Sequence, residues 1–119
     1  MLVAAADVVC CCTTAREPLF DGALVADHAT VVAIGAHEPD AREIDETLAR
    51  RATVVVETEA TALREAGDVV LAGLAAADLL PLAALVRGER VPEAGAPRLF
   101  KSTGMAWEDA VVVSALLAA

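Results

Sequence analysis

Residues 30–43 run Thr30-Val31-Val32-Ala33-Ile34-Gly35-Ala36-His37-Glu38-Pro39-Asp40-Ala41-Arg42-Glu43. The first half of this segment is a β-branched apolar run that stops at a glycine, and the second half is a polar loop. A short apolar run that ends in this way is typical of a parallel strand covered on both faces. We therefore expect a buried strand over residues 30–35, with polar groups just beyond its carboxyl end, where open α/β sheets bind ligands.

Three further segments have strand character. Residues 7–12 form an uninterrupted apolar run, and residues 53–57 contain three consecutive valines, which favour strands strongly. Residues 99–101 are expected to form a last short strand. Residues 1–5, in contrast, are typical of the end of a helix.

Helical segments fall between the predicted strands. Asp45 is the expected N-cap of a helix that ends at Arg51, with acids at its start and arginines at its end, as the helix dipole favours. A second helix is expected over residues 59–66, where Gly67 stops it. This alternation of strands and helices is typical of a sheet whose parallel strands are joined by helical crossovers.

The last third of the chain is less regular. We expect a longer, broken helical region over residues 68–87 and a loop over residues 90–97, which contain two prolines and a glycine. A closing helix through residues 108–118 is expected, with Ser102 or Thr103 as its cap.

The predicted fold is therefore α/β, a partial Rossmann-like fold with a parallel sheet of three to four strands and covering helices. A complete dinucleotide-binding domain opens with a strand, a glycine-rich turn and a helix that binds the pyrophosphate. No G-x-G occurs in this chain. Residues 1–119 are thus expected to form only the second half of such a domain.

Composition limits the function classes. With 119 residues, 57% of them hydrophobic and 3% aromatic, the chain can form one domain with an Ala, Val and Leu core. Its formal charge of −9 and single lysine argue against a nucleic-acid partner, because phosphate binding needs clustered cations.

The three cysteines, Cys10, Cys11 and Cys12, are adjacent. They match neither a metal-binding spacing nor a C-x-x-C pair, so we expect buried thiols in a reducing compartment and no metal site. The N-terminus lacks the basic region of a signal peptide. Residues 69–86 are apolar but contain Asp78 and Pro81, which favours a covering helix over a membrane span. A cytoplasmic location is expected.

Three segments together carry a resemblance to a known family. They are Ala6-Asp7-Val8-Val9 continuing to Thr13-Thr14-Ala15-Arg16-Glu17-Pro18, the segment 30–43, and Phe100-Lys101-Ser102-Thr103-Gly104-Met105-Ala106. In order, spacing and local sequence they resemble the ornithine cyclodeaminase/mu-crystallin family, from about residue 6 nearly to the end of the chain.

This resemblance implies a homodimeric, two-domain enzyme that uses NAD or NADP. The glycine-rich first half of the cofactor domain, and a substrate and dimerisation domain, are absent from these residues. The chain is then an expressed fragment, a truncated gene product or one piece of a split protein. The residues that discriminate NAD from NADP would lie upstream.

The resemblance also implies cofactor-contacting residues. Thr13 and Thr14, after the first strand, match a pair that contacts the dinucleotide, although two threonines can equally finish a strand and bond its turn. Ile34 is expected in the core and against the nicotinamide. Ser102 matches a serine near the nicotinamide, but it could equally cap a helix.

His37 is the candidate catalytic residue. Cyclodeaminases of the family have an aspartate base at the matching position and ketimine reductases a small polar residue, so the histidine departs from both. A histidine there could protonate an imine nitrogen during hydride transfer, whereas the alternative is a solvated loop side chain. The departure argues against ornithine deamination and favours a cyclic imino acid such as pyrroline-2-carboxylate or piperideine-2-carboxylate.

Three acidic residues also have candidate roles. Glu65 matches a position near the ligand cleft, but a glutamate on a helix surface is the simpler interpretation. Asp40 and Glu43 have the spacing of a capping box. We expect the isolated chain to be inactive, and the alternative to a reductase fragment is a non-catalytic or ligand-binding, mu-crystallin-like protein.

Overall fold

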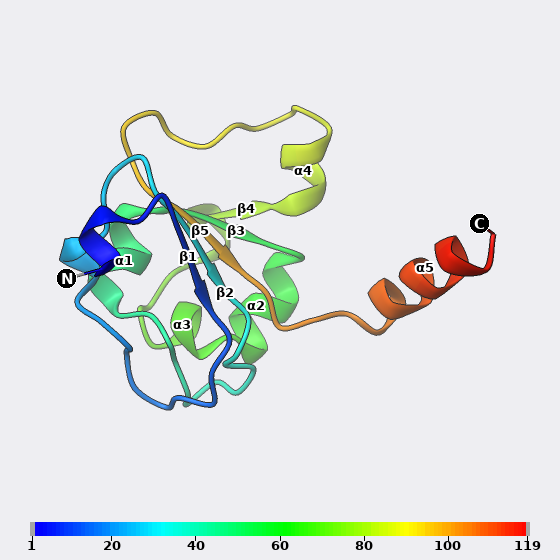
Figure 1. Cartoon of the computed structure of the whole chain (residues 1–119), viewed down its shortest axis with the longest axis horizontal. Helices are drawn as coiled ribbons and strands as arrows, with labels where there is room; N and C mark the ends of the chain where they lie inside the picture. Colours follow the sequence, from blue (N-terminus) through cyan, green and yellow to red (C-terminus); the bar gives the residue numbers. More distant parts are fainter. Residues whose placement is uncertain (1, 119) are drawn as a thin grey trace.

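Five parallel strands form one sheet in the computed structural model, which describes residues 2–118 (Figure 1). The strands are β1 (Val8–Cys11), β2 (Thr30–Ala33), β3 (Thr53–Val56), β4 (Leu79–Pro81) and β5 (Arg98–Lys101). Their order in space is β1-β2-β5-β3-β4, so the strand that comes last along the chain lies in the centre. The α/β, parallel fold is confirmed, but the expected three to four strands were too few.

The register of the sheet aligns the carboxyl ends of its strands. Cys11 is opposite Ala33, and Ala33 is opposite Lys101, which in turn pairs with Val56 across β5 and β3. Because all the strands run in one direction, the residues that follow these four positions meet at a single edge of the sheet.

One face of the sheet is covered by α1 (Glu46–Arg51), α2 (Glu59–Glu65) and α3 (Gly67–Val70). The main core lies here and includes fully buried residues of both layers, Val31, Val54, Val56, Leu48 and Val69. Asp45 accepts a hydrogen bond from the Leu48 backbone N–H at 2.8 Å, which confirms it as the N-cap of α1.

The other face is only partly covered. The helix α4 (Leu82–Val86) packs over β3 and β4 in a small cluster with Val55, Leu80 and Phe100. Strand β2 alternates between half-buried and buried residues, and Val8 on β1 is 60% exposed. The prediction that the strand at residues 30–35 is buried on both faces is therefore wrong for this chain.

The broken helical region expected over residues 68–87 is confirmed only in part, because a strand interrupts it. It contains α3, a 3₁₀ turn at Ala76–Asp78, the strand β4 and α4. Leu79 and Leu80 are almost completely buried because they pair with β3 rather than cover it. Pro81 can end β4 because β4 is an edge strand.

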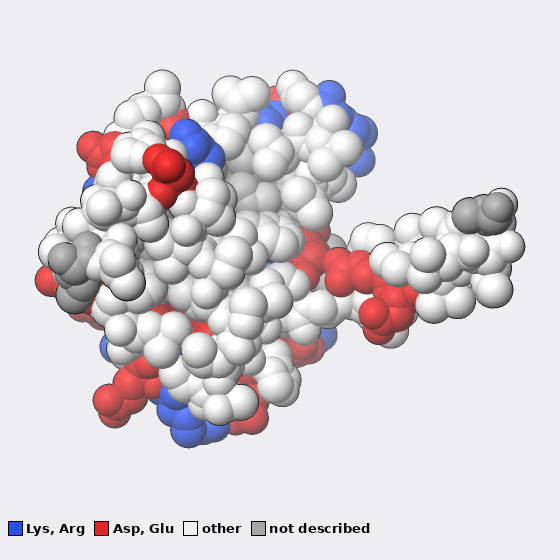
Figure 2. All heavy atoms as spheres, in the orientation of Figure 1, with Lys and Arg blue, Asp and Glu red and all other residues white. Residues whose placement is uncertain are grey.

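The last helix, α5 (Ala106–Leu117), projects away from the rest of the protein (Figure 1). None of its residues is buried, and its N-cap position is Met105. Neither Ser102 nor Thr103 caps it, so that prediction was wrong. Figure 2 shows α5 as an arm with little charge whose acidic side chains gather at its base, where Glu108 and Asp109 lie.

The amino-terminal segment contains a 3₁₀ turn at Leu2–Ala5 where a helix end was expected, and Met1 lies outside the described residues. Cys11 is buried, but Cys10 and Cys12 are exposed, which corrects the expectation of three buried thiols. Among residues 2–118 no helix has both the length and the apolarity needed to cross a membrane. No cluster of metal-ligating side chains occurs in the same range.

Candidate functional site

Three adjacent strands bring Thr13, Ile34 and Ser102 to one edge of the sheet. The Ile34 backbone N–H donates to the Cys11 carbonyl at 3.0 Å, and the Ser102 N–H donates to the Ala33 carbonyl at 3.1 Å. These bonds continue the ladders of β1 with β2 and of β2 with β5 beyond the strand ends. The predicted cofactor-contacting residues therefore lie in one row along the carboxyl edge.

A buried carboxylate lies immediately beneath this row. Glu43 is fully buried, and one of its oxygens accepts hydrogen bonds of 2.7 Å from both the backbone N–H and the hydroxyl of Thr13. Its other oxygen accepts a 2.8 Å bond from the Gly35 N–H. The capping-box interpretation of Asp40 and Glu43 is wrong, because Glu43 instead joins the ends of two strands.

The backbone of Glu43 is held by a second buried carboxylate. Asp68 accepts hydrogen bonds of 2.8 Å from the N–H groups of Glu43 and Ile44. Its other oxygen is 2.9 Å from the ammonium of Lys101, whose side chain is also completely buried. Besides this ion pair, the ammonium donates a hydrogen bond, at 2.5 Å, to the Ala36 carbonyl. We call Glu43, Asp68 and Lys101 the buried charge cluster.

Glycine at position 35 lets the two strand ends approach closely. A Cβ atom there would lie 2.1 Å from the Thr13 carbonyl oxygen and 2.4 Å from a Glu43 carboxylate oxygen. Both contacts are far shorter than van der Waals contact, so any side chain at this position would push the Thr13 loop away from Glu43.

His37 and Thr14 line a small cavity of about 180 Å³ beside this row, together with Arg16 and Glu38. Arg16 donates to Glu38 at 2.9 Å and to Asp40 at 2.6 Å. These two carboxylates hold the pKa of the Arg16 guanidinium above its ordinary value. The imidazole of His37 is exposed. Its Nδ1 atom lies 3.4 Å from the Gly35 carbonyl oxygen, which is long for a hydrogen bond.

Ile34 is not a core residue, which corrects that part of its prediction. Its side chain is 47% exposed, although it follows a strand whose Val31 and Ala33 are fully buried. A large apolar side chain is thus displayed at the edge between Thr13 and Ser102, where it can pack against a flat, apolar ring.

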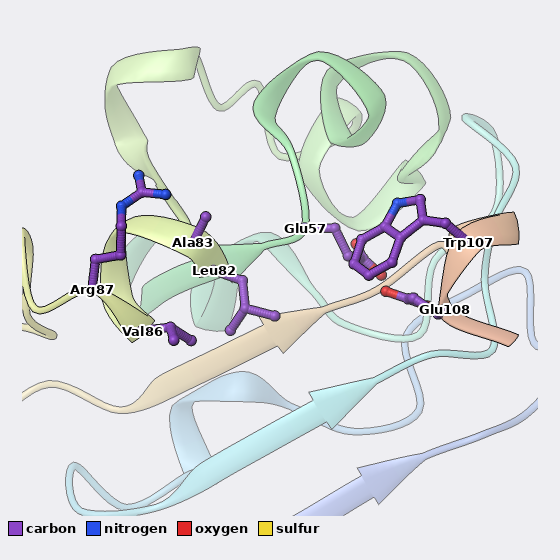
Figure 3. A pocket seen from close by; sticks show the side chains of 7 residues that line it. All are labelled: Glu57, Leu82, Ala83, Val86, Arg87, Trp107 and Glu108. Carbon is purple, nitrogen blue, oxygen red and sulfur yellow. The ribbon is translucent and has the colours of Figure 1, made fainter. Parts of the chain in front are cut away.

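Ser102 lies at the other end of the row from Thr13, and its side chain is hydrogen-bonded to a residue that follows β3. Its hydroxyl donates to a carboxylate oxygen of Glu57, which follows β3, and accepts a 3.1 Å bond from the Gly104 N–H. Glu57, Trp107 and Glu108 line a second cavity of about 310 Å³, whose remaining walls are Leu82, Ala83, Val86 and Arg87 (Figure 3). In Figure 3 this cavity opens between α4 and the first turn of α5.

Glu65 lies apart from these features. It is the last residue of α2 and accepts hydrogen bonds of 2.9 and 2.5 Å from the neighbouring Arg64. It lines neither of the two cavities described above. Its surroundings are those of a helix-surface ion pair.

Sequence reasoning missed the buried charge cluster and Glu57. The weak signal that could have found Lys101 is its position as the only lysine, inside an apolar strand of a chain with 57% hydrophobic residues. Asp68 and Glu43 gave no local signal, because acids at loop ends are usually solvated.

A family model described as the ornithine cyclodeaminase/mu-crystallin family matches residues 1–117. The ketimine reductase mu-crystallin of Mus musculus is 40% identical over 110 residues, which are 92% of this chain and 34% of the mouse protein. The chain thus spans about a third of the length of the curated relatives that it matches.

Solved structures agree with the sequence matches. The Thermococcus litoralis Delta(1)-pyrroline-2-carboxylate reductase in complex with NADH and L-proline has a TM-score of 0.87 and 29% identity, over 94% of this chain and 37% of that one. A probable ornithine cyclodeaminase from Bordetella pertussis has a TM-score of 0.85 and 37% identity, with 94% and 38% covered. From its sequence match and its parallel sheet, the chain belongs to the ornithine cyclodeaminase/mu-crystallin family.

Proposed function

We propose that this chain forms the nicotinamide-side half of the cofactor domain of an NAD(P)-dependent reductase that acts on a cyclic imino acid. The observation that carries the proposal is that Thr13, Ile34 and Ser102 lie along one sheet edge, just beyond three adjacent strands whose carboxyl ends are in register. Parallel α/β sheets bind nucleotides at this edge.

The residues of the row fit a nicotinamide nucleotide. Such a cofactor supplies the hydride, and the protein supplies position and electrostatics. Ile34 offers an exposed apolar surface for the flat ring. Thr14 is exposed beside it, free to bond a ribose or phosphate oxygen, and the structures of relatives that contain NADH or NAD+ support this cofactor class.

His37 supplies the proton in the proposed reaction. Reduction of an imine requires a hydride at carbon and a proton at nitrogen, and an imidazolium on the loop after β2 can donate that proton. His37 shares its cavity with Thr14, so it lies on the cofactor side of the edge. The substrate class follows the reductases among the relatives, which are named for pyrroline-2-carboxylate and ketimines.

For the whole protein we propose a cytoplasmic homodimer in which a second domain completes the substrate pocket. The three free thiols support a reducing compartment. The structure of an archaeal alanine dehydrogenase, a dimer with bound NAD, shares the fold at 24% identity. Size measurement of the whole protein tests the dimer, and a monomeric reductase would contradict it.

Titration of the 119-residue chain with NADH and NADPH, followed by amide chemical shifts, tests cofactor binding. We expect shifts that saturate at Thr14, Ile34, His37 and Ser102, because even half of a nucleotide site gives localised contacts. Adenosine is the matched control and should leave Ile34 and Ser102 unchanged. Shifts confined to other surfaces, or none at all, would contradict the nicotinamide assignment.

A chimera tests the chemistry, because in our proposal a second domain completes the substrate pocket. The segment replaces its counterpart in the mouse ketimine reductase, and consumption of NADPH with Δ1-pyrroline-2-carboxylate is followed. We expect reduction, and His37→Ala should lower turnover more than it raises KM. Release of ammonia from ornithine by the chimera would instead favour a cyclodeaminase.

A further inference from the structure

We propose that Glu43 is a positioning residue, whose buried carboxylate fixes Thr13 and the loop after β2 in the geometry that receives the nicotinamide nucleotide. The inference deepens the proposed function and rests on it. It assigns to the buried charge cluster the task of holding three strand ends in one arrangement.

The first step is that both oxygens of the Glu43 carboxylate accept hydrogen bonds from the strand ends. It accepts two hydrogen bonds from Thr13 and one from Gly35, all between 2.7 and 2.8 Å. The Thr13 hydroxyl donates its only proton to Glu43 and accepts a 3.2 Å bond from the Ala15 N–H. Thr13 therefore has no hydroxyl proton left to donate to a ligand, and its part in binding depends on where Glu43 places its loop.

The second step connects Glu43 to the strand that bears Ser102. Asp68 receives the N–H groups of Glu43 and Ile44, and Lys101 bonds both Asp68 and the Ala36 carbonyl. Lys101 is the last residue of β5 and directly precedes Ser102. The buried charge cluster therefore ties the ends of β1, β2 and β5 to one another.

The third step is that Glu43 stays ionised in this setting. Burial alone raises the pKa of the Glu43 carboxyl, but the bonds from Thr13 and Gly35 and the charge of Lys101 outweigh burial and leave that pKa below its usual range. The charged carboxylate forms stronger hydrogen bonds than a neutral acceptor would, so the strand ends are held firmly at neutral pH.

The test compares Glu43→Gln with Glu46→Gln, a matched loss of charge at an exposed residue of α1. Both changes remove a negative charge, so electrostatics alone would strengthen binding of the anionic NADH. Positioning predicts the opposite for Glu43→Gln, about a tenfold weaker NADH affinity at Thr14 and Ile34, because a hydrogen bond to a charged group is lost. Glu46→Gln should bind NADH at least as tightly as the unaltered chain does.

The double variant with Thr13→Val separates positioning from direct contact. Thr13→Val alone should weaken NADH binding, and Thr13→Ser, which keeps the hydroxyl, should restore it. If the hydroxyl acts through Glu43, Thr13→Val adds little in the Glu43→Gln background, whereas a hydroxyl that contacts the cofactor itself gives additive losses. If Glu43→Gln does not fold, a folded Thr13→Val chain that binds NADH as tightly as the unaltered chain would still overturn the inference.

Two readouts distinguish the failure of this inference from failure of the proposed function. Without ligand, the Thr13 and Gly35 amides should exchange slowly in the unaltered chain and faster in Glu43→Gln, while the Leu79 amide in β4 is unchanged. Unchanged or tighter NADH binding by a folded Glu43→Gln, or additive losses in the double variant, would overturn the positioning role and leave the proposed function intact. Absence of any NADH shift in the unaltered chain would overturn the proposed function and, with it, this inference.

Discussion

The sheet edge above the buried charge cluster and the projecting helix α5 are opposite extremes within the same chain. At the edge, Glu43, Asp68 and Lys101 are almost completely buried, and their charged groups are paired with one another or with backbone groups. In α5 none of the residues is buried, and Trp107, Val111 and Leu116 are each more than half exposed.

The difference shows which interactions define the arrangement of the strand ends in this domain. Polar groups buried in a low-dielectric interior must be paired in a specific geometry, and so they define one arrangement of the strand ends. An apolar helix without a packed face has only its own backbone bonds, and a helix of 12 residues is marginal in water by itself. The candidate site thus belongs to the region with paired buried groups, and we expect α5 to contribute little to its stability.

Among the changes considered, Lys101→Met should destabilise the carboxyl edge of the sheet most. It leaves the carboxylate of Asp68 buried without its 2.9 Å partner, and loss of one partner from a buried pair costs about 3–5 kcal/mol. Urea denaturation should show a stability lower by this amount, or an unfolded chain. Arg64→Met, which breaks an exposed pair with Glu65, is the control and should cost less than about 1 kcal/mol. Equal losses from the two variants would contradict the comparison.

Thiol labelling gives a second contrast, among three consecutive residues at the end of β1. Burial, followed by the nearby charges of Glu43 and Asp68, raises the pKa of the Cys11 thiol to about 11. At about pH 9, Cys11 should therefore react with iodoacetamide on the order of 100-fold more slowly than the exposed Cys10 and Cys12. Peptide mass spectrometry after timed labelling measures the three rates. Similar rates for all three would show that the edge opens readily.

Acid should loosen the edge before it affects α5. The pKa of Glu43 is below its usual value of about 4.3 in the folded chain, so its contribution is complete above that pH and is lost as the pH falls through the folded pKa. Three hydrogen bonds depend on the charge, and we expect a loss of about 1.5–3 kcal/mol. Urea midpoints across this range provide the measurement. In Glu43→Gln the stability should vary less with pH. If it falls as steeply in that variant, other carboxylates are responsible for the loss of stability in acid.

Removal of α5 should have the smallest effect. A chain that ends at Met105 loses no buried residue. Its free energy of unfolding should therefore change by less than about 1 kcal/mol. In the intact chain, α5 amides should exchange much faster than those of Thr13 and Gly35. Protection of α5 equal to that of the edge, or a large destabilisation on truncation, would show that α5 packs against the domain in solution.

The sequence was sufficient for the elements that local chemistry determines. The β-branched runs at residues 30–33 and 53–56 became strands, and Asp45 capped α1 as its side-chain chemistry requires. It failed at β4, because Leu79 and Leu80 adopt strand geometry only through pairing with β3, a tertiary effect that overrides their local helical preference.

In the candidate site, too, some residues could be predicted from the sequence and others could not. The family resemblance singled out Thr13, Ile34 and Ser102, and the expected parallel strands predicted that they meet at one edge, although Ile34 was expected inside its strand and in the core. The buried charge cluster could not be found, because its members lie 25 and 33 residues apart along the chain. Only the folded topology makes Asp68 the partner of both the Glu43 backbone and Lys101.

The central position of β5 determines when the domain can form during synthesis. Until residues 98–101 leave the ribosome, β1 with β2 and β3 with β4 are two separate pairs with no backbone bonds between them. Strand β5 therefore joins the two pairs through contacts over long chain separations, and such contacts form slowly. A ribosome that stalls before Arg98 would leave both pairs exposed to aggregation.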